Sequence, residues 1–221
     1  MRTKTLLLAA VLSAAGIASS LAQAVYSVNA VGYVNMPIVS GFQIINNPLN
    51  NTAPSGNTVT NLFASAPDGT IIYRFLQSRG GFVIITKQFG SWSDPADAAD
   101  SILPGEGFFV YNGGATTWTN TFVGEVMQGS LSHQVLSGLS IQSSEVPQAG
   151  GIVTPLGYPV AESDVVYIWD VPTQAYKIAQ FVFGSWSGDF TAEPTVAVGQ
   201  GFFVSKPATV PWVRNFSVNT P

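Results

Sequence analysis

The sequence contains no cysteine, a single histidine and few charged residues, which make up 9% of the chain. The lack of cysteine excludes disulfides and thiolate metal sites, so the fold must depend on its hydrophobic core. A Ser-His-acid site would have to use His133, and one histidine disfavours a zinc site. Nucleophile-elbow, phosphate-loop and dinucleotide motifs are absent. We therefore predict a protein that is not an enzyme, with no catalytic residue, no cofactor and no metal.

Long apolar runs are also absent beyond the start of the chain, since no later stretch approaches the roughly twenty residues of a membrane helix. Arg2 and Lys4 precede a short apolar run at 6–12, and Ala22-Gln23-Ala24 has the small-x-small pattern of a cleavage site. This predicts a signal peptide at residues 1–24. The mature chain is expected to be secreted (periplasmic, cell-surface or extracellular) and to contain no membrane span.

The charge balance restricts the partners. Removal of the predicted signal peptide leaves six basic residues against twelve acidic ones, a formal charge of −6. Nucleic-acid binding depends on clustered Lys and Arg, and binding to anionic lipid depends on a polybasic segment. We therefore expect no nucleic-acid partner and no electrostatic attachment to a membrane surface.

The most informative feature that is present is an internal repeat. Phe89-Gly90-Ser91-Trp92-Ser93 returns ninety-four residues later at 183–187, and Gly-x-Gly-Phe-Phe-Val at 105–110 returns at 199–204. Between Val59 and Phe122, 18 of 64 positions are identical to the residue at this offset, and no gap is needed. A fixed spacing held over such a length predicts two homologous units.

Glycine and proline, 22 and 14 residues, are spread through the chain between short runs of Val, Ile, Phe, Tyr, Trp and Thr. This pattern is typical of many short strands separated by turns. We predict an all-β fold of two homologous, tandem, β-sandwich-like units packed together, β-unit 1 at residues 25–126 and β-unit 2 at residues 127–221. Gly80-Gly81 is the expected centre of a hairpin. The only expected helical turn lies at residues 94–100, with Asp94 as its N-cap.

Most aromatic residues repeated in both units, such as Trp118 and Trp212, are expected to fill the cores, because each buried ring contributes about 1.5–3 kcal/mol. Trp92 and Trp186 differ, since serine flanks both sides of each indole. If any aromatic residues are exposed ligand-binding platforms, these two are the candidates. Stacking of a sugar on them would make a polysaccharide or another cell-surface component the partner.

The acidic residues leave two alternatives open. Paired carboxylates could hydrolyse glycosides, although Glu106 is replaced by Gln200 in the second unit. Asp94, Asp97 and Asp100 could gather around calcium, which prefers six to eight oxygen ligands. We favour a solvated acidic loop, because the second unit has no acid at the corresponding positions.

Four stretches carry a resemblance to a known group of proteins: Val25 to Asn35, Pro104 to Phe109, Phe122 to Val126, and Val146 to Gly150. In these stretches the chain resembles a family of uncharacterised exported proteins of verrucomicrobial and planctomycete-type bacteria. The resemblance implies a secreted, internally duplicated β-protein. It implies no activity, cofactor or catalytic residue.

We therefore expect an exported, non-enzymatic structural or interaction protein of the cell surface or extracellular material. One alternative is a carbohydrate-binding module that uses Trp92 and Trp186, and a second is a glycoside hydrolase with non-repeated acids. The sequence leaves the partner, the oligomeric state and the choice between periplasm and extracellular space open.

Overall fold

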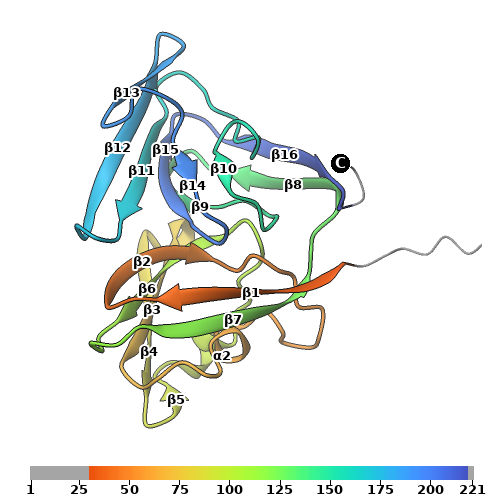
Figure 1. The fold of residues 1–221 in the computed structure, drawn as a ribbon, viewed down its shortest axis with the longest axis vertical. Coiled ribbons are helices and arrows are strands. Elements are labelled where there is room, and N and C mark those ends of the chain that lie inside the picture. Colours follow the sequence, from red (N-terminus) through yellow and green to blue (C-terminus); the bar gives the residue numbers. More distant parts are fainter. Residues whose placement is uncertain (1–29, 219–221) are drawn as a thin grey trace, which may run out of the picture.

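The computed structural model describes residues 30–218, so the predicted signal peptide lies outside the described residues. The all-β prediction is confirmed: antiparallel strands dominate the chain and form two lobes, one following the other in sequence (Figure 1). Among residues 30–218, no helix combines the length and the apolar character needed to cross a membrane.

The first lobe contains seven strands and three short helical turns. They are β1 (Val31–Ile38), β2 (Gly41–Asn46), α2 (Val59–Leu62), β3 (Thr70–Leu76), η1 (Gln77–Arg79), β4 (Gly81–Gln88), β5 (Ser91–Trp92), α3 (Pro95–Ala98), β6 (Gly107–Asn112) and β7 (Trp118–Glu125). Five strands form an antiparallel sheet in the order β2-β6-β3-β4-β5, and β1 pairs with β7 along its whole length.

The second lobe follows the same plan. Its strands are β8 (Gly129–Val135), β9 (Gly138–Gln142), β10 (Gly150–Gly151), β11 (Val165–Asp170), β12 (Ala175–Val182), β13 (Ser185–Gly188), β14 (Thr195–Val196), β15 (Phe202–Lys206) and β16 (Val210–Phe216). The five-stranded sheet has the order β9-β15-β11-β12-β13, and β16 pairs with β8. These orders match the first lobe strand for strand, and β10 and β14 form an additional short pair.

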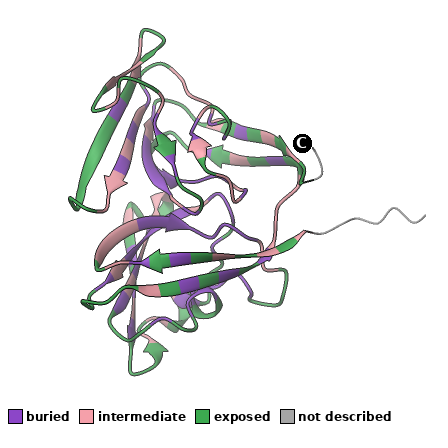
Figure 2. Ribbon diagram, viewed as in Figure 1, coloured by how far each residue is buried: buried purple, intermediate pink, exposed green. Residues whose placement is uncertain are grey.

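Each lobe has its own core between the five-stranded sheet and the strand pair. Side chains on a strand alternate between its two faces, and β7 accordingly alternates buried and exposed residues (Figure 2). In the first lobe, Phe63 packs edge-on against Phe108 and Phe122, with ring centroids 5.8 and 5.7 Å apart. In the second, Trp212 packs against Tyr158 at 5.5 Å. The repeated aromatics Trp212, Phe108 and Phe122 are thus core residues, as predicted, whereas Trp118 is only partly buried against the first core.

Local signals explain where the short helical turns lie. Asp94 caps α3 by accepting hydrogen bonds from the amides of Ala96 and Asp97, both at 3.1 Å, as expected from the sequence. Helix α2 was not expected, although Thr58 caps it by accepting a hydrogen bond from the Asn61 amide at 3.4 Å. A threonine within a Gly/Asn/Pro-rich loop is a weak signal, because the same residue also favours turns.

The expected two-residue turn at Gly80-Gly81 is wrong. Leu76 pairs with Gly81, so Gly81 is the first residue of β4 and the connection contains four residues. Gln77 to Arg79 form a 3-10 turn, and Gly80 closes it in the left-handed region at φ 65°. Only the first of the two glycines supplies the positive φ that the turn requires.

A third hydrophobic cluster joins the two lobes. It contains Ile44 and Phe109 from the first lobe and Ile141 and Phe203 from the second. These residues lie on the face of each five-stranded sheet that points away from the core of its own lobe. The two sheets therefore pack together through these faces. The lobes share a hydrophobic interface and are not separated by a flexible linker.

The contacts between the lobes are reciprocal. The Asn46 amide donates to the Gly199 carbonyl at 2.9 Å, and the corresponding Ser143 amide donates to the Gly105 carbonyl at 3.0 Å. The isolated bridge between Ile45 and Gln200 likewise has its counterpart between Gln142 and Glu106. In each case a contact from the first lobe to the second is repeated by the corresponding residues from the second lobe to the first. Such reciprocal contacts indicate that the two lobes are related by an approximate twofold axis. The lobes therefore associate as two subunits of a symmetric dimer would.

The repeated glycines before the Phe-Phe-Val strands make this close approach possible. A Cβ on Gly107 would lie 2.4 Å from Cγ2 of Ile141, and one on Gly201 would lie 2.9 Å from Cγ2 of Ile44. Both distances are shorter than a carbon–carbon contact allows. Gly107 and Gly201 thus lack side chains because the opposite lobe occupies that space.

Candidate functional site

The two candidate platforms, Trp92 and Trp186, lie on β5 and β13 and are half-buried against the cores of their own lobes. The Lys87 ammonium lies 5.5 Å from the centre of the Trp92 ring, and Phe181 packs against Trp186 at 5.1 Å. The structure does not bring the two indoles together, because β5 and β13 lie at opposite ends of the molecule (Figure 1).

A pocket of about 440 Å³ adjoins Trp92. Polar side chains, among them Asn61, Lys87 and Ser91, line it together with the indole. An aromatic face beside hydrogen-bonding groups is a combination that suits a sugar.

The most exposed large apolar residues are neighbours of these tryptophans. Phe89 and Phe183 are 97% and 98% exposed, each at the first position of the two-residue turn that joins β4 to β5 or β12 to β13. Both have left-handed backbones, at φ 51° and 53°, and each is followed by a glycine with positive φ. Turns of this type favour asparagine or glycine at the first position, and a bulky residue there is an outlier.

An acidic side chain braces each turn. The Gly90 amide donates to Asp68 Oδ1 at 2.9 Å. In the other lobe, the amides of Phe183 and Gly184 donate to the two carboxylate oxygens of Glu162 at 2.9 and 2.7 Å. Asp68 and Glu162 correspond in the repeat, so both lobes hold a protruding phenyl group with the same device. We call Phe89 and Phe183 the aromatic knobs.

A groove of about 340 Å³ lies between the two five-stranded sheets, and we call it the aromatic groove. Six aromatic side chains line it: Phe42, Tyr73, Phe82, Phe109, Trp169 and Tyr176. Phe82 and Tyr176, which correspond in the repeat, remain 45% and 38% exposed. The rings of Trp169 and Tyr176 pack edge to face, 4.8 Å apart.

The groove offers few hydrogen bonds. The indole nitrogen of Trp169 already donates to the Phe42 carbonyl at 2.8 Å. Burial raises the pKa of Tyr176 to about 12 and also raises that of Tyr73, with the neighbouring Tyr111 adding to the second shift. Both phenols therefore stay neutral at physiological pH. The groove is suited to an apolar or aromatic group rather than to a sugar, whose hydroxyls would lack partners there.

The acids do not gather into one site. Asp94 caps α3, while Asp97 pairs with Arg79 at 2.8 Å. Arg74 lies between Glu106, at 2.8 Å, and Asp100, at 3.9 Å. Within residues 30–218, no three metal-ligating side chains are grouped so that they could hold an ion.

Glu106 is an acid whose pKa the fold raises. Burial raises the pKa of its carboxyl, and the facing Arg74 guanidinium offsets part of that shift. The same carboxylate accepts hydrogen bonds from Nε and Nη2 of Arg74, at 3.1 and 2.8 Å. These contacts give Glu106 a structural partner in the interior of the first lobe.

The single histidine lies near the junction of the lobes. His133 Nδ1 is 3.2 Å from Glu145 Oε2, its Nε2 is 3.2 Å from Gln142 Oε1, and its ring packs on Trp212 at 5.1 Å. A serine nucleophile is not among these neighbours. The arrangement holds β8 against the following segment.

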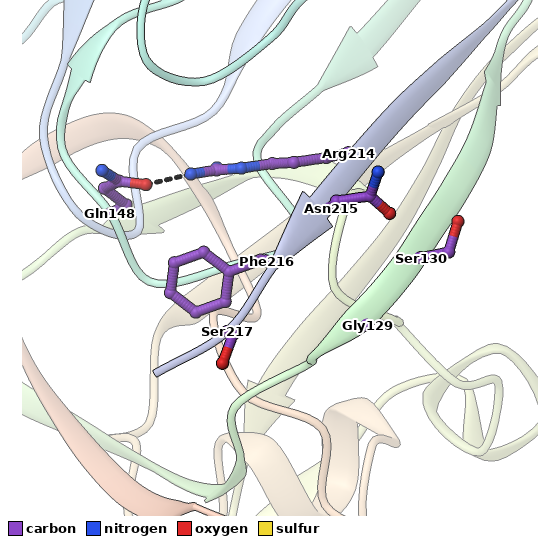
Figure 3. Close-up of a pocket in the computed structure, with 7 residues that line it drawn as sticks. All are labelled: Gly129, Ser130, Gln148, Arg214, Asn215, Phe216 and Ser217. Carbon is purple, nitrogen blue, oxygen red and sulfur yellow. Dashed lines mark hydrogen bonds between the residues drawn. The ribbon is translucent and has the colours of Figure 1, made fainter. Parts of the chain in front are cut away.

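A larger pocket, of about 610 Å³, lies beside the end of β16 (Figure 3). Arg214 and Phe216 project from this strand towards Gln148, which accepts a hydrogen bond from the guanidinium. The guanidinium lies 5.2 Å from the centre of the Phe216 ring. No repeated motif marks this pocket in the sequence, because Arg214 has no counterpart in the first unit, where Asn120 stands.

The aromatic groove and the knobs were also not predicted, although the sequence contains a signal for the knobs. Phe-Gly between two strands, repeated in both units, places an aromatic residue where a tight turn requires a positive φ. The groove depends on how the two sheets face each other, which strand alternation alone does not specify.

Comparisons with protein-family models, with curated proteins and with solved structures gave no match.

Proposed function

We propose that this chain is an exported, non-enzymatic structural protein that forms cell-surface or extracellular material by associating with further copies of itself. The observation that carries the proposal is the pair of aromatic knobs. Phe89 and Phe183 are almost fully exposed, stand at equivalent positions, and lie at opposite ends of the molecule, next to β5 and β13 (Figure 1).

The knobs are costly for the isolated molecule. An exposed phenylalanine forgoes about 1.5–3 kcal/mol that its burial would contribute. A left-handed backbone at a bulky residue costs roughly 1–2 kcal/mol. Both penalties occur twice, once in each lobe, at turn positions whose left-handed backbone asparagine would tolerate. A contact with another molecule would account for such residues, since it would bury the phenyl rings and so recover the free energy of their burial.

The aromatic groove supplies a matching surface on the same molecule. Its volume of about 340 Å³ can admit one phenyl ring, and its lining is aromatic throughout. A knob on one copy and a groove on the next make a heterologous contact, which adds further copies until a ring closes or as an open filament. One inserted aromatic buries about 150–250 Å². This area is far below the roughly 1,200 Å² of a stable interface, so we expect reversible, concentration-dependent assembly instead of a fixed dimer.

Sedimentation velocity over a concentration series tests the proposal. The wild-type protein is expected to form growing assemblies, whereas the Phe89→Asn/Phe183→Asn variant should remain monomeric. Asparagine tolerates the left-handed region, so this variant should be as stable as the wild type or more stable. Tyr33→Thr removes an exposed aromatic side chain from β1, outside the knobs and the groove, and is the matched control; it should assemble like the wild type. Equal assembly with and without the knobs would refute the proposal.

A second candidate function, carbohydrate binding, is favoured by the polar pocket beside Trp92. Glycan titrations followed by tryptophan fluorescence should then show quenching that Trp92→Ala abolishes and Trp186→Ala reduces. A flat response across neutral and acidic glycans would remove this candidate and leave the assembly proposal untouched.

A further inference from the structure

Arg214 is a cation without a carboxylate partner among residues 30–218. Six basic side chains lie in residues 30–218, and four of them are ion-paired: Arg74 with Glu106, Arg79 with Asp97, Lys177 with Asp170, and Lys206 with Asp164. The Lys87 ammonium donates to the carbonyls of Phe63 and Ala64 instead. Arg214 is the second cation whose partners in the described residues are neutral. Unlike Lys87, it bonds to side chains and not to backbone carbonyls, and it lines the pocket of about 610 Å³.

Two groups hold the Arg214 side chain in place. Its Nη1 donates to Ser144 Oγ at 3.2 Å, and its Nη2 donates to Gln148 Oε1. Burial lowers the pKa of the guanidinium, the direction expected when no anion compensates for lost solvation. A guanidinium has five N–H donors, so this one keeps donors to spare beyond these two contacts.

Comparison of the two lobes shows that the pocket belongs to the second lobe. In the first lobe, Asn120 stands where Arg214 does and donates to the Leu62 carbonyl at 3.1 Å. Phe122 there is covered by Phe63 and is 1% exposed. The sequence counterpart of Phe63 is Gly157, and the counterpart of Phe122 is Phe216, which is only half-buried.

The lining restricts the kind of ligand. Among residues 30–218, no acidic side chain lines the pocket. Besides Arg214, Gln148 and Phe216, the described lining contains short hydroxyl or amide side chains, namely Ser130, Asn215 and Ser217. Guanidinium groups bind carboxylates through paired hydrogen bonds, and the other polar groups can accept or donate to hydroxyls. The lining contains one cation, Arg214, so the pocket offers a charged partner to one carboxylate of a ligand.

We propose that this pocket binds a sugar acid, a pyranose with a single carboxylate. Arg214 pairs with the carboxylate, Gln148 keeps the guanidinium oriented, and the Phe216 ring lies beside the sugar. The volume of about 610 Å³ is large enough for one such ring and its hydroxyls. The ligand can be the free acid or the terminal residue of an acidic polysaccharide, since both present the same chemistry.

Calorimetric titration with glucuronate, glucose and acetate tests the inference. Glucuronate should bind, and glucose and acetate should each bind at least tenfold more weakly, because one lacks the carboxylate and the other lacks the ring. Arg214→Gln should weaken glucuronate binding at least tenfold, and Arg214→Lys less. Arg79→Gln, which removes a cation already paired with Asp97, is the control and should leave the affinity unchanged.

Three outcomes would overturn the inference. These are equal binding of glucuronate and glucose, acetate binding as tight as that of glucuronate, and an unchanged affinity in Arg214→Gln. Thermal unfolding of each variant checks that it is folded, and Gln148→Leu provides a second route, with an expected loss of affinity while Arg214 is kept. If an oligomer of the sugar acid binds one protein molecule per oligosaccharide chain, the pocket recognises the terminal residue of a polysaccharide. If the free acid binds and the oligomer does not, the ligand is the small molecule. The knob variant should bind glucuronate like the wild type, so this test is independent of assembly.

Discussion

Replacing Gly107 by alanine tests how the two lobes are joined. The added Cβ would lie 2.4 Å from Cγ2 of Ile141 and 3.1 Å from the Gln142 carbonyl oxygen, across the boundary between the lobes. Cγ2 is attached directly to the branch point of a buried side chain, so it cannot swing away, and the carbonyl belongs to β9. The sheets must therefore separate slightly. Overpacking of this kind costs about 1–3 kcal/mol.

The expected consequence is a lower unfolding temperature. For a chain of this size, 1 kcal/mol corresponds to about 2–4 °C, so Gly107→Ala should lower Tm by roughly 2–12 °C in differential scanning calorimetry. Gly201→Ala should act in the same direction, because its Cβ would lie 2.9 Å from Cγ2 of Ile44. Gly32→Ala is the matched control: it lies within a strand with no atom within 4 Å of the new Cβ. That variant should be unchanged or slightly stabilised.

A double-mutant cycle tests whether Gly107 and Ile141 are coupled across the boundary between the lobes. Ile141→Ala removes the atom that the new Cβ meets, so Gly107→Ala should cost less in that background than in the wild type. Contacting residues commonly show coupling of about 0.5–3 kcal/mol. Equal costs in the two backgrounds, or a Gly107→Ala variant as stable as Gly32→Ala, would refute the proposed packing of the lobes.

Two further predictions concern buried polar groups. Lys206→Met should destabilise the protein by about 3–5 kcal/mol in chemical unfolding, because it leaves Asp164 buried without its cation. The double change Lys206→Asn/Asp164→Thr copies Asn112 and Thr70 of the first lobe and should recover much of that loss; no recovery would contradict the equivalence of the two positions. The Tyr176 phenol should ionise near pH 12 in an absorbance titration compared with Tyr176→Phe. Since its pKa is raised on folding, the stability it contributes is present below about pH 10 and is lost as the pH rises towards 12; ionisation near pH 10 would contradict the burial of this ring.

The fold class could be predicted because its signals are local. Strand alternation, turn residues and the Asp94 cap each depend on a few neighbouring residues, and each is found in the structure. The ninety-four-residue spacing also corresponds to the observed match in strand order. Internal duplication of an ancestral unit is our explanation for that match. Where the local signal was ambiguous, as at Gly80-Gly81, the expected two-residue turn is instead a four-residue connection that ends at Gly80.

The candidate site was harder to predict because it depends on three-dimensional contacts. The aromatic groove arises where two sheets face each other, and nothing in the alternation of β4 indicates that Phe82 lies opposite the second lobe. Burial likewise cannot be read from residue type alone. Trp92 and Phe89 are three residues apart in one repeated motif, yet the tryptophan is half-buried and the phenylalanine is almost fully exposed.

Mixing two assembly-deficient variants is the most direct test of self-association. Phe89→Asn/Phe183→Asn lacks the knobs and keeps the groove, whereas Phe82→Lys/Tyr176→Glu keeps the knobs and places charges in the groove without changing the net charge. Each variant alone should sediment as a monomer. Their mixture should form small complexes that stop growing, because the knobs of one variant can enter only the grooves of the other. A mixture that remains monomeric, or either variant assembling alone like the wild type, would contradict the account.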